Sequence, residues 1–336
     1  MTKKEPECLA IGVGTKNSQG KWLEVFFPRA LINPGEELID KALKNSGYKG
    51  GNISCNVPQE IMKDLEKVFN NAAYLRGTNS PMVMVVLESA LPPQDVPQAY
   101  LRLHLLSHRL KKPNEQNLEG IFSILPTVAW TSIGPKDPSE LNEIIFNGRL
   151  ANEHINIFAL DKFPNLTDYV IPEGVRIADS HRVRLGAYIG EGTTVMHEGF
   201  INFNAGTLGI SMIEGRISQG VTVDEGSDLG GSSSTMGTLS GGNETLISIG
   251  KDCLLGANSG LGIPLGDRCI IEAGLYITAG TKVEMITSKD KVEEIKASDL
   301  SYKNDLLFIR NSLTGTVQCK QNPKTVNLNE ELHSNN

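Results

Sequence analysis

The sequence lacks several features that would assign it at once to a class of proteins. No stretch approaches the roughly 18 apolar residues of a membrane-spanning helix, and the first residues lack the apolar run of a signal peptide. The five cysteines include no CxxC pair, which excludes a zinc knuckle and a CxxC redox motif. A net charge of −7 provides no basic face for nucleic acid or an anionic membrane. We therefore expect a cytoplasmic protein without nucleic-acid or membrane partners.

What the sequence does contain, over residues 170–286, is a branched aliphatic residue at nearly every sixth position. A period of six fits neither the 3.6 residues per turn of a helix nor the alternation of an ordinary strand. It is typical of a parallel β-helix of hexapeptide repeats, in which each aliphatic points into a narrow core and three hexads close one coil. The inward positions expected are Ile171, Ile177, Val183, Ile189, Val195, Ile201, Ile213, Ile217, Val223, Leu229, Ile249, Leu255, Leu261, Leu265, Ile271, Ile277 and Val283.

Two further properties of the repeat suit a narrow prism. Glycine occupies turn positions, where a positive φ angle costs little. The position four residues beyond each aliphatic is mostly small, which leaves space at the corners of a triangular coil. A Gly-rich sandwich of short strands is the alternative fold, but it would not keep a six-residue phase. The small residues are Ala187, Thr193, Ala205, Ser227, Ser233, Cys253, Ser259, Cys269 and Thr281.

The hexad pattern divides the chain into four predicted parts. They are an α/β domain at 1–157, the β-helix at 158–286, a C-terminal segment at 287–319 and a polar, mobile tail at 320–336. Apolar periodicity in the first part predicts helices at 36–43, 60–73, 95–109 and 138–149. Strands are expected at 8–13, 22–27, 82–87, 120–125 and 128–132, and a last strand is expected at 306–309.

Two interruptions of the repeat are the best candidates for function. Ile213 and Ile217 are only four residues apart, so the phase slips there. Residues 231–246 are rich in Ser, Thr and Gly and have no inward aliphatic at the regular spacing, which predicts a loop that leaves the prism. Because loops on a rigid scaffold commonly carry function, we expect the chemistry at these two places.

The slip contains a pair of charged residues suited to carboxylate and acyl chemistry. Glu214 and Arg216 lie two residues apart, on one side of an expected strand, beside glycines that allow close approach. A carboxylate against an apolar wall is suited to act as a base or a nucleophile. A guanidinium binds a carboxylate in bidentate fashion. The same spacing also fits a surface ion pair worth about 0–1 kcal/mol, so the residues alone leave both interpretations open.

Glu198 is a second candidate. Three hexads close one coil, so Ser180, between Asp179 and His181, is expected below it. If the prism forms trimers, three copies of Glu198 would meet near the threefold axis and hold a divalent cation. A solvated carboxylate is the alternative interpretation.

Four long motifs resemble the tetrahydrodipicolinate N-succinyltransferases, in their longer actinobacterial and pseudomonad form. The motifs are VMHEGFINFNAGTLG at 195–209, IEGRIS at 213–218, MGTLSGG at 236–242 and LLGANSGLG at 254–262. The resemblance extends over residues 170–312. It implies a left-handed β-helix, a homotrimer and a place in diaminopimelate and lysine biosynthesis. It also implies transfer of succinyl from succinyl-CoA to tetrahydrodipicolinate, with no tightly bound cofactor.

The resemblance assigns roles to individual residues. Glu214 becomes the catalytic carboxylate, drawn either as a covalent nucleophile or as a general base to the attacking amine. Glu198 becomes a ligand of an axial magnesium ion, although the second acid expected one coil below is replaced here by His181, with Asp179 slightly displaced. The residues implied for substrate and CoA binding are Arg216, Gly231, Ser234, Ala257, Glu272, Ala273, Gly280, Lys296, Arg310, Asn311 and Ser312.

Three other functions remain to be weighed. Some hexapeptide acyltransferases use a histidine base, and His197 is the candidate for that role. A γ-type carbonic anhydrase needs three converging histidines, two of them five residues apart, whereas His181 and His197 are sixteen apart and are the only histidines of the solenoid. A non-enzymatic scaffold would have neither the slip nor the ejected loop.

Overall fold

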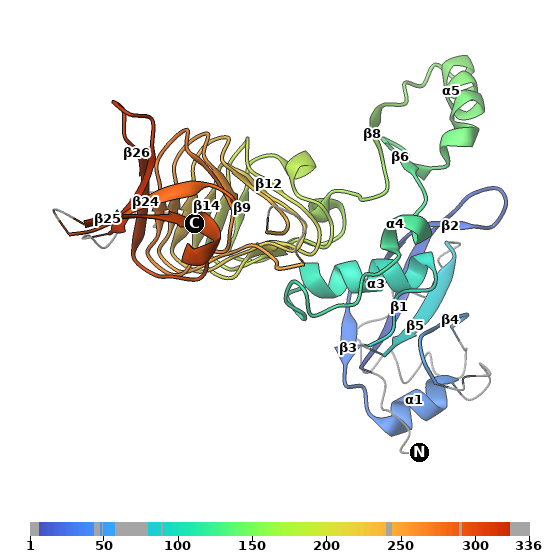
Figure 1. Ribbon diagram of the computed structural model, residues 1–336. Coiled ribbons are helices and arrows are strands. Elements are labelled where there is room, and N and C mark those ends of the chain that lie inside the picture. Colours follow the sequence, from blue (N-terminus) through green and yellow to red (C-terminus); the bar gives the residue numbers. More distant parts are fainter. Residues whose placement is uncertain are drawn as a thin grey trace. The chain divides into compact units, whose positions relative to one another are not determined.

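The computed structural model describes residues 7–43, 48, 50–57, 80–88, 90–239, 244–288 and 291–322. The chain forms two compact units (Figure 1). The first contains Met1–Leu105 and Glu115–Pro164, and the second contains Leu106–Asn114 and Asn165–Asn336. Among the described residues, no helix has the length and apolar character needed to cross a membrane.

The first unit is built on an antiparallel sheet covered by one short helix. The strand order is β2 (Trp22–Phe26), β1 (Cys8–Lys16), β5 (Met82–Leu87) and β4 (Ile53–Cys55), and β3 (Ala30–Ile32) also pairs with β1. Helix α1 (Glu36–Leu43) buries Ile39, Ala42 and Leu43 against Leu9 and Met84 of the sheet. The strands at 8–13 and 22–27, which pair as a hairpin, are confirmed, and so are the helix at 36–43 and the strand at 82–87. The helix expected at 60–73 lies outside the described residues.

A second, smaller sheet has the order β7 (Gly134–Lys136), β6 (Val128–Thr131) and β8 (Ile157–Asp161). The helix predicted at 138–149 is present as η3 (Pro138–Glu140) followed by α5 (Leu141–Leu150). Asp137 caps η3, because its carboxylate accepts a hydrogen bond from the Ser139 N–H at 2.9 Å. The helix predicted at 95–109 is α3 (Val96–Ser107), and the strand at 128–132 is β6.

The strand predicted at 120–125 is wrong. Residues Ile121–Ile124 form a short helix, α4, which starts after Gly120 in a left-handed backbone conformation (φ 76°). The backbone N–H groups of Ile124 and Leu125 donate to the carbonyls of Gly120 and Ile121. A short apolar run reads the same for a buried strand and for a helical turn, so the pattern alone did not separate the two.

The second unit is a parallel β-helix with three faces, visible as a stack of coils in Figure 1. Face A contains β10 (Tyr188–Ile189), β13 (Gly206–Thr207), β16 (Thr222–Val223) and β19 (Ser248–Ile249). Face B contains β9 (Arg176–Ile177), β11 (Thr193–Val195), β14 (Ser211–Ile213), β17 (Ser227–Leu229), β20 (Leu254–Leu255), β22 (Ile270–Ile271) and β26 (Leu306–Arg310). Face C contains β12 (Phe200–Ile201), β15 (Arg216–Ile217), β18 (Ser234–Thr235), β21 (Gly260–Gly262) and β23 (Tyr276–Thr278). Short 3-10 turns lie at η4 (Leu166–Asp168), η5 (Ser180–Arg182) and η6 (Ala297–Leu300).

The predicted core of the β-helix is confirmed from Val183 to Val283, where every expected inward aliphatic is at most 2% exposed. Ile171 is the error, because it precedes the first strand and is 77% exposed. Two inward positions are taken by threonine. Thr207 is fully buried, and Thr235 is 2% exposed with its hydroxyl donating to the Arg216 carbonyl at 3.1 Å. A hydroxyl satisfied by the neighbouring coil can occupy the core at little cost.

Thr235 also corrects the predicted loop at 231–246. Because Ser234 and Thr235 form strand β18 in register with β21, the coil continues regularly to that point. The excursion begins afterwards and closes with a bridge between Thr238 and Leu246, and residues 240–243 lie outside the described part of the chain. A strand is therefore present here although its inward residue is a threonine and not an aliphatic.

The C-terminal segment extends face B. β24 (Lys282–Ser288) pairs with β25 (Lys291–Lys296) and with β27 (Val317–Gln321), and β27 pairs with β26. The last strand expected at 306–309 is confirmed as β26. Strand β27 includes Lys320 and Gln321, two residues that were predicted to belong to the tail. The remainder of that tail, residues 323–336, lies outside the described residues.

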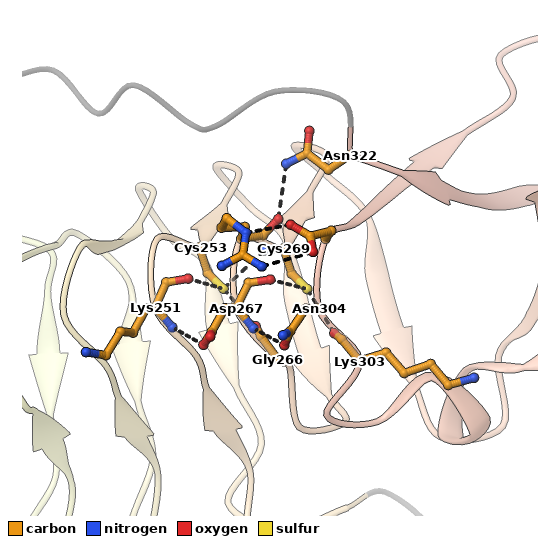
Figure 2. Close-up of polar contacts among 10 residues, drawn as sticks. Lys251, Cys253, Gly266, Asp267, Cys269, Lys303, Asn304 and Asn322 are labelled. Atoms are coloured by element: carbon orange, nitrogen blue, oxygen red, sulfur yellow. Dashed lines mark hydrogen bonds and ion pairs between the residues drawn. The ribbon is translucent and has the colours of Figure 1, made fainter.

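Polar contacts fasten this segment to the last coils (Figure 2). The Arg268 guanidinium pairs with the Asp305 carboxylate at 2.5 and 3.0 Å, and Asn322 donates to the Arg268 carbonyl at 3.1 Å. Buried Cys253 and Cys269 donate to the carbonyls of the following coil. The pKa of the Cys253 thiol is raised mainly by its hydrogen bond with Cys269 and secondly by burial. These two cysteines are therefore buried structural residues that stack in adjacent coils of the core.

Candidate active site

The phase slip corresponds to one shortened corner of the prism. Ile213 is in register with Val195 and Leu229 on face B, and Arg216 is in register with Phe200 and Ser234 on face C. The coils on either side therefore turn from face B to face C with four residues, at 196–199 and 230–233. The coil between them turns with two, Glu214 and Gly215. We call this line of turns the B–C edge.

A short corner between two longer ones leaves a recess, because the flanking turns project beyond it. The recess has a volume of about 760 Å³. Its lining is strongly polar and contains both basic and acidic side chains. The lining residues are Asp179, Arg182, His197, Glu198, Phe200, Gly215, Arg216, Ser232, Ser233 and Ser234.

One glycine makes the short corner possible, and a second glycine lies beside it. A Cβ atom on Gly215 would lie 2.2 Å from the Ser233 hydroxyl oxygen and 2.7 Å from the Ser233 carbonyl oxygen, so a larger residue cannot fit there without displacement. A Cβ atom on Gly231 would lie 3.5 Å from Oε2 of Glu214. The half-buried Glu214 carboxylate therefore lies beside the Gly231 backbone, at a distance that would leave ordinary contact with a Cβ.

Arg216 and Ser234, predicted as binding residues, are brought together by adjacent strands β15 and β18. The Arg216 Nε and one terminal nitrogen donate to the Ser234 hydroxyl at 3.2 and 2.7 Å. Arg216 is exposed, and its guanidinium has further N–H donors beyond those used by Ser234. The group is therefore held in place and able to bind an anion such as a carboxylate.

Arg182 is a residue of the recess that the sequence reasoning missed. The bridge between Val183 and Ile201 places Arg182 beside Phe200, one coil below. Its guanidinium donates to the main-chain carbonyl of Glu198 at 2.7 Å. Counting one coil back from Phe200 would have identified it, because η5 interrupts the strand pattern but not the stacking. The recess thus contains two guanidinium groups.

Glu198 does not have the surroundings of a magnesium ligand within one chain. Its Oε2 accepts a hydrogen bond from the Ser232 hydroxyl at 3.1 Å. The register places Ser180 below it, and nearby Asp179 is engaged with His181 at 3.1 Å. Hydrogen bonds from the His181 backbone and ring lower the pKa of Asp179. Among the described residues, no three His, Cys, Asp or Glu side chains are grouped to hold a metal.

Most of the other predicted binding residues lie along the same B–C edge. Gly231, Ala257 and Ala273 follow strands that are paired in register, so they occupy the same corner position in successive coils. Glu272 Oε2 accepts the Arg310 backbone N–H at 2.7 Å, which joins Arg310 and the following Asn311 and Ser312 to this edge. One continuous edge is therefore lined by Glu214, by the column formed by Gly231, Ala257 and Ala273, and by Arg310.

Gly280 and Lys296 form a separate pair. Lys296 ends β25 opposite Lys282 of β24, and the Ala297 and Ser298 N–H groups donate to the carbonyls of Thr281 and Ala279. These hydrogen bonds hold Gly280 and Lys296 close together, in the turn that directly follows face C. The structure does not place them on the B–C edge.

Comparisons with known proteins identify a family. Residues 246–279 match the family described as a hexapeptide repeat of succinyl-transferase, and residues 125–165 match the middle region of tetrahydrodipicolinate N-succinyltransferase. Proteins named 2,3,4,5-tetrahydropyridine-2,6-dicarboxylate N-succinyltransferase from Pseudomonas paraeruginosa, Pseudomonas putida and Vibrio cholerae are 53%, 52% and 50% identical to this chain. Each alignment covers 98% of this chain and at least 98% of the relative.

A solved structure agrees with these relatives. It comes from Campylobacter jejuni and is described as a 2,3,4,5-tetrahydropyridine-2-carboxylate N-succinyltransferase. It matches with a TM-score of 0.85 at 31% identity, over 96% of this chain and 94% of that chain. The hexapeptide match and this structure confirm the predicted fold class, a left-handed parallel β-helix with an N-terminal α/β domain. The chain belongs to the tetrahydrodipicolinate N-succinyltransferase family.

Proposed function

We propose that the protein transfers a succinyl group from succinyl-CoA to tetrahydrodipicolinate and produces N-succinyl-2-amino-6-oxopimelate and free CoA. The names of its relatives support this reaction. The observation that carries it is the recess at the short corner, which is lined by Arg182, Arg216 and Gly215, the residue that follows Glu214. A substrate with two carboxylates matches two guanidinium groups.

In the proposed mechanism one water first adds across the C=N bond of the cyclic imine, which leaves a ring nitrogen that carries a proton. That nitrogen attacks the thioester carbonyl of succinyl-CoA, the N–C bond forms as the C–S bond breaks, and CoA leaves as a thiolate that takes up a proton. Glu214 accepts the proton released at the nitrogen and so acts as a general base, and the acylated ring then opens to the ketone as its hydroxyl proton passes to the nitrogen. Backbone N–H groups of the B–C edge stabilise the negative oxygen that develops on the thioester carbonyl. Thioester aminolysis needs no covalent relay, so we favour this role over an acyl-enzyme.

The proposed CoA site runs along the B–C edge. Gly231, Ala257 and Ala273 carry little or no side chain, so an extended pantetheine arm can lie close to the backbone there. Arg310 supplies a cation for the CoA phosphates, with Glu272, Asn311 and Ser312 beside it. Gly280 and Lys296 belong to a neighbouring turn, and we assign them to the far end of CoA.

Assembly and location belong to the same proposal. We expect a homotrimer in the cytoplasm, with succinyl-CoA as co-substrate and no tightly bound cofactor. A trimer would cover the open flank of the recess and exclude water from it. For an axial magnesium ion, Glu198 would be the ligand that each chain contributes, and no step of the mechanism depends on it.

His197 supports a second candidate function, a hexapeptide acyltransferase with a histidine base and a different amine or hydroxyl acceptor. The observation in its favour is that His197 is exposed and lines the same recess as Arg216. Its loss would then abolish transfer, whereas loss of Glu214 would not.

The direct test of the proposed reaction is thiol release from succinyl-CoA by the purified full chain. We expect release that depends on tetrahydrodipicolinate and a product whose mass equals that of N-succinyl-2-amino-6-oxopimelate. Acetyl-CoA serves as the matched control for the acyl donor. An active preparation that releases thiol equally well without the cyclic imine would refute the proposal.

A further inference from the structure

The two turns that project on either side of Glu214 are joined to each other. Glu198 belongs to the turn at 196–199, and Ser232 belongs to the turn at 230–233. Their hydrogen bond, 3.1 Å from the Ser232 hydroxyl to Glu198 Oε2, therefore bridges the recess past the short corner at Glu214. The bond is between exposed side chains, so its value depends on how well both ends are fixed.

Both ends of this bridge are fixed by further contacts. The Arg182 guanidinium donates to the Glu198 main-chain carbonyl at 2.7 Å, which holds the lower turn. The upper turn is held by the Ser233 N–H, which donates to the Gly230 carbonyl at 3.0 Å, and by the Ser234 N–H, which donates to the Ser259 carbonyl at 3.0 Å. The main chain on both sides of the bridge is therefore already held, and only the two side chains lose freedom when the bridge forms.

The backbone at Ser232 indicates that its side chain has a use. Ser232 has a φ angle of 58°, in the left-handed region. At the equivalent turns of the next two coils this conformation is adopted by Asn258 (φ 56°) and Gly274 (φ 73°). Asparagine and glycine tolerate this conformation well, whereas serine tolerates it less well. A serine at this position is explained by the hydroxyl that it gives to Glu198.

The upper turn supplies two neighbours of the short corner and leads directly to a third residue. Gly231 lies against the Glu214 carboxylate and Ser233 closes over Gly215, while Ser234, the first residue of β18 after the turn, holds the Arg216 guanidinium. A shift of this turn would move the wall beside Glu214 and would disturb the start of β18, on which the position of Arg216 depends. A misplacement of this kind commonly reduces the rate of an enzyme without unfolding it.

We infer that Glu198 is a positioning residue that acts through Ser232, in the role of a hydrogen-bond acceptor. Its bond holds the turn at 230–233 in place over the short corner, so that Glu214 and Arg216 meet the substrate correctly. This inference rests on the proposed succinyl transfer. It requires only a neutral acceptor oxygen at residue 198, whereas a metal ligand or a base at that position requires the charge.

The test is steady-state succinyl transfer by the full chain carrying Glu198→Gln, Glu198→Ala, Ser232→Gly or the double change Glu198→Ala with Ser232→Gly. Ser232→Gly removes the hydroxyl and also removes the backbone strain, so a loss of rate cannot come from strain. Asp252→Gly is the matched control, because Asp252 has the same backbone conformation (φ 55°) at a turn on another edge.

We expect Glu198→Ala and Ser232→Gly each to lower kcat/KM for the cyclic imine about tenfold, which is within the value of one ordinary hydrogen bond. The double variant should lose no more than either single variant, and KM for succinyl-CoA should stay within about twofold. Glu198→Gln should retain near wild-type activity, because its amide oxygen still accepts the Ser232 hydroxyl. Asp252→Gly should behave as wild type, and all variants should unfold at similar temperatures.

Three results would overturn the inference while leaving the proposed function intact. The first is a Glu198→Gln variant as impaired as Glu198→Ala, which would show that the charge matters. The second is a Ser232→Gly variant as active as wild type, and the third is a double variant in which the two losses multiply. A wild-type chain without substrate-dependent thiol release would instead refute the proposed function itself.

Discussion

Glu214 and Gly215 turn a regular coil into a site. Every other described turn from face B to face C between β11 and β23 has four residues, and this turn has two. Its glycine is needed because the Ser233 hydroxyl lies 2.2 Å from where a Cβ would stand, and its glutamate is held half-buried beside Gly231. The proposed chemistry thus lies at a position where the scaffold departs from its own repeat.

Gly215→Ala should damage both fold and activity. The added Cβ must displace the Ser233 backbone, at a cost of about 1–3 kcal/mol in the free energy of unfolding. Gly231→Ala is the matched variant, because its Cβ would meet Glu214 Oε2 at an ordinary 3.5 Å. It should fold normally and lose activity only. Chemical unfolding and thiol release measured on both variants check this, and equal stability of the two would contradict it.

At the scale of elements, the β-helix core was largely predictable, because one aliphatic per hexad is an unambiguous period. The slip was predictable for the same reason: two residues missing from a strict repeat are visible in the sequence. The start of the excursion after Thr235 was not, since a threonine can replace an aliphatic when a neighbouring coil satisfies its hydroxyl. Arg182 was missed because a 3-10 turn hides its stacking beside Phe200.

Two isoleucines that were both predicted to point into the core differ in the structure, and substituting each of them tests which one is a core residue. Ile271 is fully buried, so Ile271→Ala should lower the free energy of unfolding by about 2–5 kcal/mol. Ile171 is 77% exposed, so Ile171→Ala should change it by less than about 0.5 kcal/mol. Denaturant unfolding of both variants measures the difference. Similar losses would show that Ile171 packs in the core.

The ion pair between Arg268 and Asp305 fastens the C-terminal strands to the last coils (Figure 2). Hydrogen bonds from Arg268 lower the pKa of Asp305 below its usual 3.8. Because the carboxyl pKa is lower in the folded state, the ionised carboxylate stabilises the fold at pH values above the usual pKa. This stabilisation is lost as the pH falls through the folded-state pKa. Asp305→Asn should therefore lower the melting temperature near pH 7, and the difference from wild type should shrink below about pH 4. A difference that is constant with pH would contradict this.

At the scale of the whole molecule, the recess is open on the flank of the prism, and the proposed homotrimer would close it. We expect sedimentation equilibrium to give three chains per particle at assay concentrations. Activity should fall when dilution dissociates the trimer, because water would then enter the site. A stable monomer with full activity would contradict this part of the account.

The central claim is that Glu214, at the short corner, is the base for succinyl transfer. The most direct measurement is the rate of tetrahydrodipicolinate-dependent thiol release from succinyl-CoA by Glu214→Gln, compared with His197→Asn, whose residue lines the recess next to Glu214. The account predicts that Glu214→Gln folds normally and loses about 10²- to 10⁴-fold in kcat, whereas His197→Asn stays within about tenfold of wild type. An inactive His197→Asn variant with an active Glu214→Gln variant would contradict the account.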